Sequence, residues 1–472
     1  PEKPNEYKSG NKWLPVELIE ETIPLKNGRD TTITIRITHH GPIISDVHGL
    51  LKEKNVAMSM AWTGHWNTTE MDAWIKLNTM ENWEDFSRGV RDFGVPGQNI
   101  VYADINGNIG WRPAVYIPVR KDGHTMVPRP GNDPDYDWKG KVPFEEMPYL
   151  YNPKKGYIST ANNKTIGDEF PYYISGFWAD PSRIEQINRR LDSMDNMSVE
   201  KMKSVQLDQT SPFAQEILPF IWLTETGEET GNLKRAYEFL KVWDGVEDVD
   251  SEAALIFHAT MRNLVLNLYG DELALLGQNY LEAYTGLKYL VHRKIREIFK
   301  TGESSWIDNI TTPNHVETLN EIISKSVADA IIELEESFGI NISNWKWGDA
   351  HSLTHPHMLS KVKILDKLFN LNVGPYRSGG SDKTPNAGGY SFNKPYHQTA
   401  GASMRRIVDF SKMNETQFIL PTGQSGIPSS PHYRDQAEMY HSGKYRTTWF
   451  NEDFIRSEKN AHLFRHLILT PK

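Results

Sequence analysis

The spacing of apolar residues changes twice along this chain, and that change constrains the fold more than any single motif. Alternating apolar residues at 16–25 and 31–38 flank Asn27 and Gly28, the pattern of a β-hairpin with an Asn-Gly turn. Between about 180 and 339, apolar residues recur every three to four positions, as in amphipathic helices. After 344 the patterns of strands and loops return. We therefore predict an α+β fold with a mostly helical region inserted into a sheet-based core.

The same patterns predict individual elements and a division of the chain into 1–195, 196–340 and 341–472. Further strands are expected at 56–62 (fully buried), 99–105, 109–117 and 156–160, with a long wrapping loop at 121–155. Helices are expected at 69–79, 81–93, 198–207, 212–225, 232–244, 251–268, 279–299 and 313–338. Another helix begins near Asp180 and Pro181, which have the residue types of an N-cap and a first helical position.

Composition restricts the classes of partner and compartment. The chain has 472 residues and a net charge of -9, with scattered basic residues, which argues against a nucleic-acid partner. It contains no apolar run of the ~18 residues that a membrane span needs, and no signal-peptide pattern at its start. Cysteine is absent, which excludes disulfides and a thiolate nucleophile. We expect a periplasmic or secreted protein without a membrane span.

The segment Gly156–Asn163 is the first candidate for chemistry. Its β-forming residues run directly into two amides, Asn162 and Asn163, at the predicted end of a strand. An asparagine amide in that position can donate a hydrogen bond to a developing oxyanion. The alternative, which is commoner for any single pair, is an Asx turn that closes a loop.

Two other groups of residues have simpler readings. His351, His355 and His357 have a spacing that could hold zinc, but Pro356 interrupts the helix that would align them, so we expect local packing. Asp104–Asn108 resembles part of a calcium loop but lacks its later ligands, which favours a hairpin turn.

Acidic residues and an arginine leave two further alternatives open. Glu145 and Glu146, with Asp133–Asp137, could serve as glycosidase carboxylates, although no spacing pairs them across a site and a solvated loop is the simpler reading. Arg183, near a helix start, lies in an unfavourable dipole field and needs a partner, either an ion pair or a bound carboxylate.

A set of short motifs in a fixed order resembles the penicillin acylase group of N-terminal-nucleophile (Ntn) hydrolases. The set spans nearly the whole chain, in the order of that family's β subunit, although each piece alone has little specificity. Its members are Lys26–Gly28, Thr38–Pro42, Ala61–Thr63, Val101–Gly110, Asp137–Gly140, Val142–Glu145, Tyr151–Pro153, Gly156–Ile158, Ala161–Asn163, Arg183–Ile184, Gly401–Arg405, Gly423–Gly426 and His432–Gln436.

This resemblance implies an αββα sandwich, incomplete in this chain, and hydrolysis of an acyl amide. In the family, a precursor cleaves itself, the new N-terminal Ser attacks the amide, and its own α-amine serves as base. Residue by residue, Asn162 matches the oxyanion-hole Asn, Arg183 matches the Arg that holds the geometry of the site, and Trp62 matches a position in the acyl pocket.

The chain also departs from the family pattern. It begins at Pro1, where the family's β subunit is already well advanced, so the nucleophilic Ser is expected outside this sequence and the chain alone is expected to be inactive. Its partners would be the missing α chain, the N-terminal β segment and a small-molecule acyl amide. Calcium, found in some members, is in doubt because Pro171–Ser175 carries no carboxylate, so no metal ligand is assigned.

Two alternatives to a penicillin-type acylase remain open. The first is an acyl-homoserine-lactone acylase, and the second, of another class, is a binding or scaffold protein that kept the fold and lost the chemistry.

Overall fold

The computed structural model describes residues 3, 5–26, 28–49, 51, 56–121 and 126–457. The chain divides into two compact units, Pro1–Trp178 and Ala179–Lys472. None of the helices in the described part is both long and apolar enough to cross a membrane.

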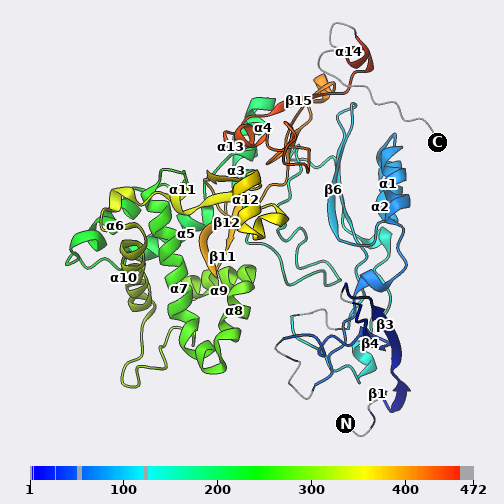
Figure 1. The fold of residues 1–472 in the computed structure, drawn as a ribbon, viewed down its shortest axis with the longest axis horizontal. Coiled ribbons are helices and arrows are strands. Elements are labelled where there is room, and N and C mark those ends of the chain that lie inside the picture. Colours follow the sequence, from blue (N-terminus) through cyan, green and yellow to red (C-terminus); the bar gives the residue numbers. More distant parts are fainter. Residues whose placement is uncertain are drawn as a thin grey trace. The chain divides into compact units, whose positions relative to one another are not determined.

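The first unit contains short antiparallel sheets and one pair of helices (Figure 1). A two-stranded ribbon pairs β1 with β2, and two three-stranded sheets have the orders β3-β4-β5 and β6-β7-β8. The bounds are β1 Glu6–Ser9, β2 Lys12–Pro15, β3 Glu17–Ile23, β4 Thr31–Thr38, β5 Gly41–Pro42, α1 Glu70–Asn78, α2 Trp83–Arg91, β6 Gln98–Ala103, β7 Ile109–Ala114 and β8 Leu150–Tyr151. Three 3₁₀ turns lie at Thr63–His65 (η1), Pro134–Tyr136 (η2) and Phe144–Glu146 (η3).

Both predicted hairpins of this unit are confirmed. Strands β3 and β4 pair from Glu17 opposite Ile37 to Ile23 opposite Thr31, although Asn27 of the predicted turn lies outside the described residues. Strands β6 and β7 pair around the second Asn-Gly turn. The helices predicted at 69–79 and 81–93 are α1 and α2, and α2 packs on the β6–β7 hairpin over a small apolar core that includes Phe86 and Tyr102.

Two predicted strands of the first unit are wrong. Residues 156–160 form no strand in the described structure, because the ladder with β7 is taken by β8 and ends at Tyr151, after which a turn closes with Gly156 N–H donating to Pro153 O. Residues 56–62 are not a buried strand either. They make an isolated bridge between Ser59 and Ile43, and Val56 is 54% exposed.

The second unit is built around α7, a long helix with α10 packed along it (Figure 1). Nearly all faces of α7 are apolar and buried, as expected for a helix inside a core. The helices are α3 Ser182–Asp192, α4 Val199–Gln206, α5 Pro212–Trp222, α6 Gly231–Val242, α7 Glu252–Leu276, α8 Gln278–Gly286, α9 Lys288–Thr301, α10 Leu319–Phe338, α11 Trp347–Ala350, α12 Lys363–Phe369, α13 Ala437–His441 and α14 Glu452–Arg456. The 3₁₀ turns are η4 Ile342–Asn344, η5 Met358–Lys361 and η6 Phe410–Lys412.

Two sheets complete the second unit, in the part of the chain where strands were predicted to return. One has the order β10-β9-β12-β11 and the other β13-β14-β15. Their strands are β9 Ser352–His355, β10 Val373–Arg377, β11 Gly388–Ser391, β12 Lys394–Gly401, β13 Arg405–Ile407, β14 Glu415–Ile419 and β15 Arg446–Trp449.

Three helix predictions of the second unit need correction. The helix expected at 279–299 is two helices, α8 and α9, which meet at Leu287, directly after Gly286. The helix expected from 313 begins at Leu319, because Thr318 and Glu321 form a capping box there. Pro181, not Asp180, is the N-cap of α3, although Asp180 still accepts a hydrogen bond from Ser182 N–H at 3.0 Å.

Candidate functional site

Asn162 lies on an exposed turn of the first unit. Its backbone is left-handed, with φ of 60°, a conformation that asparagine tolerates better than most residues. The neighbouring Asn163 accepts a hydrogen bond from Ala161 N–H at 2.9 Å and donates from Nδ2 to Lys164 O at 2.7 Å. These hydrogen bonds link Asn163 back to Ala161 and forward to Lys164, and the bend that they stabilise presents Asn162 at the surface rather than at the end of a strand.

Trp62 lies at the start of the 3₁₀ turn η1 in the same unit and is 50% exposed. Its ring meets the ring of His65 edge-on, with 5.3 Å between centroids. Gly64 is required beneath the indole, since a Cβ there would lie 2.4 Å from a ring atom. The loop therefore presents a large aromatic surface to solvent, as a binding surface needs, but its predicted role in an acyl pocket stays a prediction.

Arg183 belongs to the second unit, where it is the second residue of α3 and half-buried. The start of that helix is fixed by Asp180, which forms an ion pair with Arg296 of α9 at 3.1 Å. Arg296 also donates to Ser182 Oγ at 2.8 Å and pairs with Glu216 at 2.6 Å. Burial by itself would raise the pKa of Asp180, but the charges of Lys383 and Arg296 outweigh it and lower that pKa. These ion pairs and the hydrogen bond to Ser182 therefore fix the first turn of α3, which carries Arg183.

A cavity of about 300 Å³ in the second unit contains another ionisable group of residues. Lys383 Nζ lies 2.7 Å from His292 Nδ1 and 3.0 Å from Asp382 Oδ2. Burial and the nearby Lys383 charge lower the pKa of His292 to about 4, so the imidazole is a neutral acceptor at neutral pH. Phe213 and Phe257 form part of the apolar wall.

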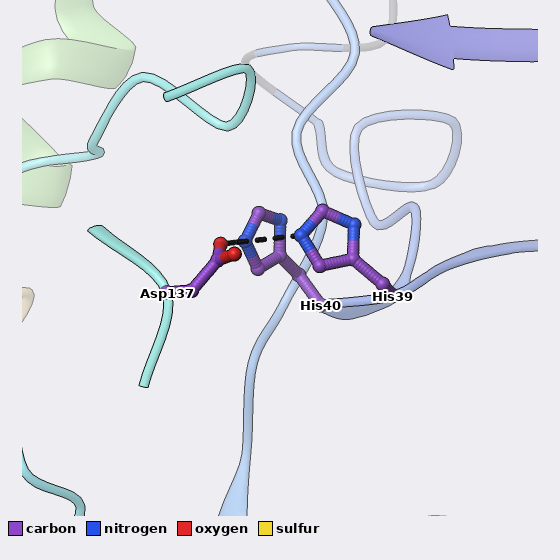
Figure 2. A group of neighbouring side chains, drawn as sticks. All are labelled: His39, His40 and Asp137. Carbon is purple, nitrogen blue, oxygen red and sulfur yellow. Dashed lines mark hydrogen bonds and ion pairs between the residues drawn. The ribbon is translucent and has the colours of Figure 1, made fainter. Parts of the chain in front are cut away.

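A histidine pair and an aspartate meet in the first unit, although sequence reasoning did not connect them (Figure 2). His40 Nε2 and His39 Nε2 lie 2.8 and 3.2 Å from the same Oδ1 of Asp137. Partial burial would raise the pKa of Asp137, but hydrogen bonds from His40 and His39 outweigh it and lower the pKa. The available signal was the doubled histidine after a strand, but its partner lies 97 positions away.

The three histidines near β9 have separate partners. His351 is fully buried, its ring stacks on Trp347 with 4.4 Å between centroids, and its Nδ1 lies 2.6 Å from Tyr396 O. His355 faces the ring of His441, and His357 accepts from Leu359 N–H at 3.1 Å. These contacts agree with local packing.

The two segments weighed for calcium, Pro171–Ser175 of the family pattern and the separate Asp104–Asn108 motif, make hydrogen bonds within the protein. Tyr172, within Pro171–Ser175, donates its hydroxyl to Glu146. In the turn at Asp104, the carboxylate accepts from Asn106 N–H, Asn108 N–H and Nδ2, and the Tyr102 hydroxyl. Hydrogen bonds from Asn108 and Tyr102 lower the pKa of Asp104 to about 2, so this carboxylate is already satisfied by a turn.

Glu145 and Glu146, two of the carboxylates considered for glycosidase chemistry, have ordinary surface contacts. Glu145 pairs with Arg91 at 3.1 Å, with both side chains more than half exposed, while Glu146 accepts from Tyr172. These contacts fit a solvated loop.

Comparisons with known proteins agree on one family. The penicillin amidase family model matches residues 1–457. Acyl-homoserine lactone acylase QuiP of Pseudomonas syringae pv. tomato is 25% identical over 460 residues, covering 93% of this chain and 54% of that protein. Penicillin G acylase of Escherichia coli is 25% identical over 490 residues, covering 99% of this chain and 56% of that protein. The chain thus spans about half the length of the curated relatives it matches.

A solved structure extends the likeness to three dimensions. Thermostable penicillin G acylase from Alcaligenes faecalis superposes with a TM-score of 0.66 at 19% identity, covering 99% of this chain and 84% of that one. At this identity the match establishes the fold alone.

Proposed function

Because the chain belongs to the penicillin amidase family, we propose that its protein hydrolyses the amide between an acyl group and an amine. The observation that carries this proposal is the family match across residues 1–457. Relatives named as acyl-homoserine lactone acylases and as penicillin acylases support the same reaction class, acyl transfer from nitrogen to water.

The reaction we propose proceeds through an acyl-enzyme on an N-terminal Ser that lies outside this 472-residue sequence. The Ser oxygen attacks the amide carbonyl, its proton passes to the α-amine, and the C–N bond breaks as that proton is delivered to the departing amine. Water then attacks the ester, releases the carboxylic acid and restores the Ser hydroxyl. The Ser would be exposed by self-cleavage of a longer precursor, so this chain alone would be inactive.

Three residues of this chain receive roles in that reaction. Asn162 donates its side-chain amide to the oxyanion of the tetrahedral intermediate, and its exposed, left-handed turn supports this role. Arg183 holds the geometry of the site from the start of α3, which the Asp180–Arg296 pair anchors. Trp62 contributes an aromatic wall to the acyl pocket, in keeping with its half-exposed ring.

Two candidate substrates within this class differ in their acyl and amine groups. A penicillin-type or related N-acyl substrate follows from the family as a whole. An acyl-homoserine lactone is the second candidate, favoured by relatives of that name that match at 24–26% identity over 93–97% of the chain.

A substrate panel tests the proposal on the protein expressed from its complete gene. Intact mass records whether the precursor cleaves itself, and amine release is measured on phenylacetyl amides, penicillin G and acyl-homoserine lactones of several chain lengths. We expect two chains after cleavage and kcat/KM at least about tenfold higher for one acyl class than for the others. Failure to cleave, with no amine released from any substrate, would mean a binding or scaffold protein.

A further inference from the structure

The His39–His40–Asp137 group has the donor set and spacing of a transition-metal site (Figure 2). Its three ligand atoms all lie within 4.8 Å of one another. In a tetrahedral zinc centre with metal–ligand bonds of about 2.0–2.1 Å, neighbouring ligand atoms are about 3.3 Å apart. The separations of 2.8 and 3.2 Å between the histidine nitrogens and Asp137 Oδ1 are already close to that value. Small side-chain movements would therefore admit an ion.

The backbone brings both imidazoles to one side, which adjacent residues of an extended strand cannot do. Strand β4 ends at Thr38, and His39 and His40 lie in a turn whose next residue, Gly41, has φ of 126°. Thr38 Oγ1 accepts from His40 N–H at 3.3 Å and donates to Gly41 O at 3.2 Å. The two rings are 3.8 Å apart between centroids. This turn therefore aims two nitrogens at one carboxylate.

Tyr7 orients the first histidine as an outer partner does in a metal site. Its hydroxyl lies 3.2 Å from His39 Nδ1 and accepts from His39 N–H at 3.0 Å. Its ring stacks on the imidazole with 5.4 Å between centroids and 14° between planes. A histidine that donates from Nδ1 keeps Nε2 as the lone pair that binds a metal. In His39, Nε2 is the nitrogen that faces Asp137, and a bound ion would take the place of the hydrogen bond that joins these two atoms here.

We propose that His39, His40 and Asp137 bind a divalent transition-metal ion, Zn²⁺ in the first instance, with a fourth position open to water. Two nitrogen ligands and one carboxylate favour such an ion over calcium, which takes oxygen ligands. The side chains of His39 and Asp137 are each 31% exposed, so water reaches the site. The site is independent of the acylase reaction proposed above and would join the end of β4 to the loop at Asp137.

Metal titration of tag-free protein, stripped with chelator and dialysed, tests this site. Zn²⁺ binding is measured by calorimetry for the wild type, His39→Ala, His40→Ala, Asp137→Asn and the matched control His315→Ala. In the control, His315 is exposed and pairs with Glu321 at 3.0 Å, and among the described residues no third metal-ligating side chain completes a group with them. We expect one equivalent bound by the wild type and the control, and at least tenfold weaker binding by each of the three ligand variants.

Two further measurements separate ligand loss from misfolding. Tyr7→Phe keeps the stacked ring and removes only the outer hydroxyl, and we expect about 10–100-fold weaker binding. Co²⁺ added to the wild type should give the visible absorption of a four-coordinate, nitrogen-ligated ion. No bound equivalent in the wild type, or equal affinity in the wild type and all ligand variants, would overturn the proposal and leave a hydrogen-bonded triad only.

Discussion

Two buried histidines, His351 and His292, make the stability of the second unit depend on pH. Burial lowers the pKa of His351 to about 3 from the usual 6.5, although its hydrogen bond to the Tyr396 carbonyl acts in the opposite direction. His292 has a pKa lowered to about 4. Both imidazoles are therefore neutral in the folded protein at a pH where the unfolded chain is already protonated.

The unfolding free energy should consequently fall as pH drops below 6.5, because there the unfolded state binds more protons than the folded state. Each such histidine contributes a slope of about 1.4 kcal/mol per pH unit, and the His351 contribution ends near pH 3. Urea unfolding at several values between about pH 7 and 5 measures the slope. His351→Gln should reduce the slope of unfolding free energy against pH by about 1.4 kcal/mol per pH unit, and the contribution of His292 should remain.

The exposed His315 provides the control for that measurement. The His315 side chain is 56% exposed, so His315→Gln measures what the loss of an imidazole that is not buried does to the slope. An unaltered slope in His351→Gln would contradict the assignment.

The residues of the proposed site were only partly predictable from sequence. Asn162 could be selected by its family motif, but its turn could not, because the strand expected at 156–160 depended on which segment pairs with β7. The His39–His40–Asp137 group joins residues 97 and 98 positions apart, and no local spacing connects them. Exposure of Trp62 likewise depends on the contacts of a loop that sequence patterns describe as a buried strand.

At the scale of elements, the start of α3 is held against α9 by a buried ion pair. The Asp180 side chain is 1% exposed and that of Arg296 is 11% exposed. Arg296→Met should lower the unfolding free energy by about 3–5 kcal/mol, because it breaks the ion pair of the buried Asp180 and leaves it only the charge of Lys383. Chemical denaturation measures the change.

A second cation on α9 provides the matched control. Lys294 pairs with Glu297 at 2.7 Å with both side chains more than half exposed, so Lys294→Met should cost less than about 1 kcal/mol. Equal losses in the two variants would show that the buried network does not anchor α3.

Helices and hairpins with regular periodicity were predicted well, and their ends less so. The apolar stripe of α10 and the alternating patterns around the two Asn-Gly turns are local in the sequence, and they were enough to predict these elements. The break between α8 and α9 at Leu287 and the late start of α10 at Leu319 depend on capping and on residues of low helix propensity, which a window of apolar residues averages away.

At the scale of the whole molecule, the predicted α+β Ntn-hydrolase fold is confirmed by the structural match to penicillin G acylase. Contacts divide the chain after Trp178, where sequence patterns mark the start of the helical region rather than a boundary. The division into 1–195, 196–340 and 341–472 stays a prediction. Which segments pack into one compact unit depends on contacts between residues far apart in the sequence, including strand pairing. The local periodicity of apolar residues does not reveal these contacts.

The most direct test of the proposed chemistry is the turnover of Asn162→Ala in the protein from the complete gene, on whichever acyl amide the wild type prefers. Asn196→Ala is the matched control, since Asn196 is also exposed and has a positive φ, of 50°. If Asn162 donates to the oxyanion, kcat should fall by about 10²–10³-fold with little change in KM, while Asn196→Ala retains wild-type turnover. Wild-type kcat in Asn162→Ala would contradict the assignment of the oxyanion hole.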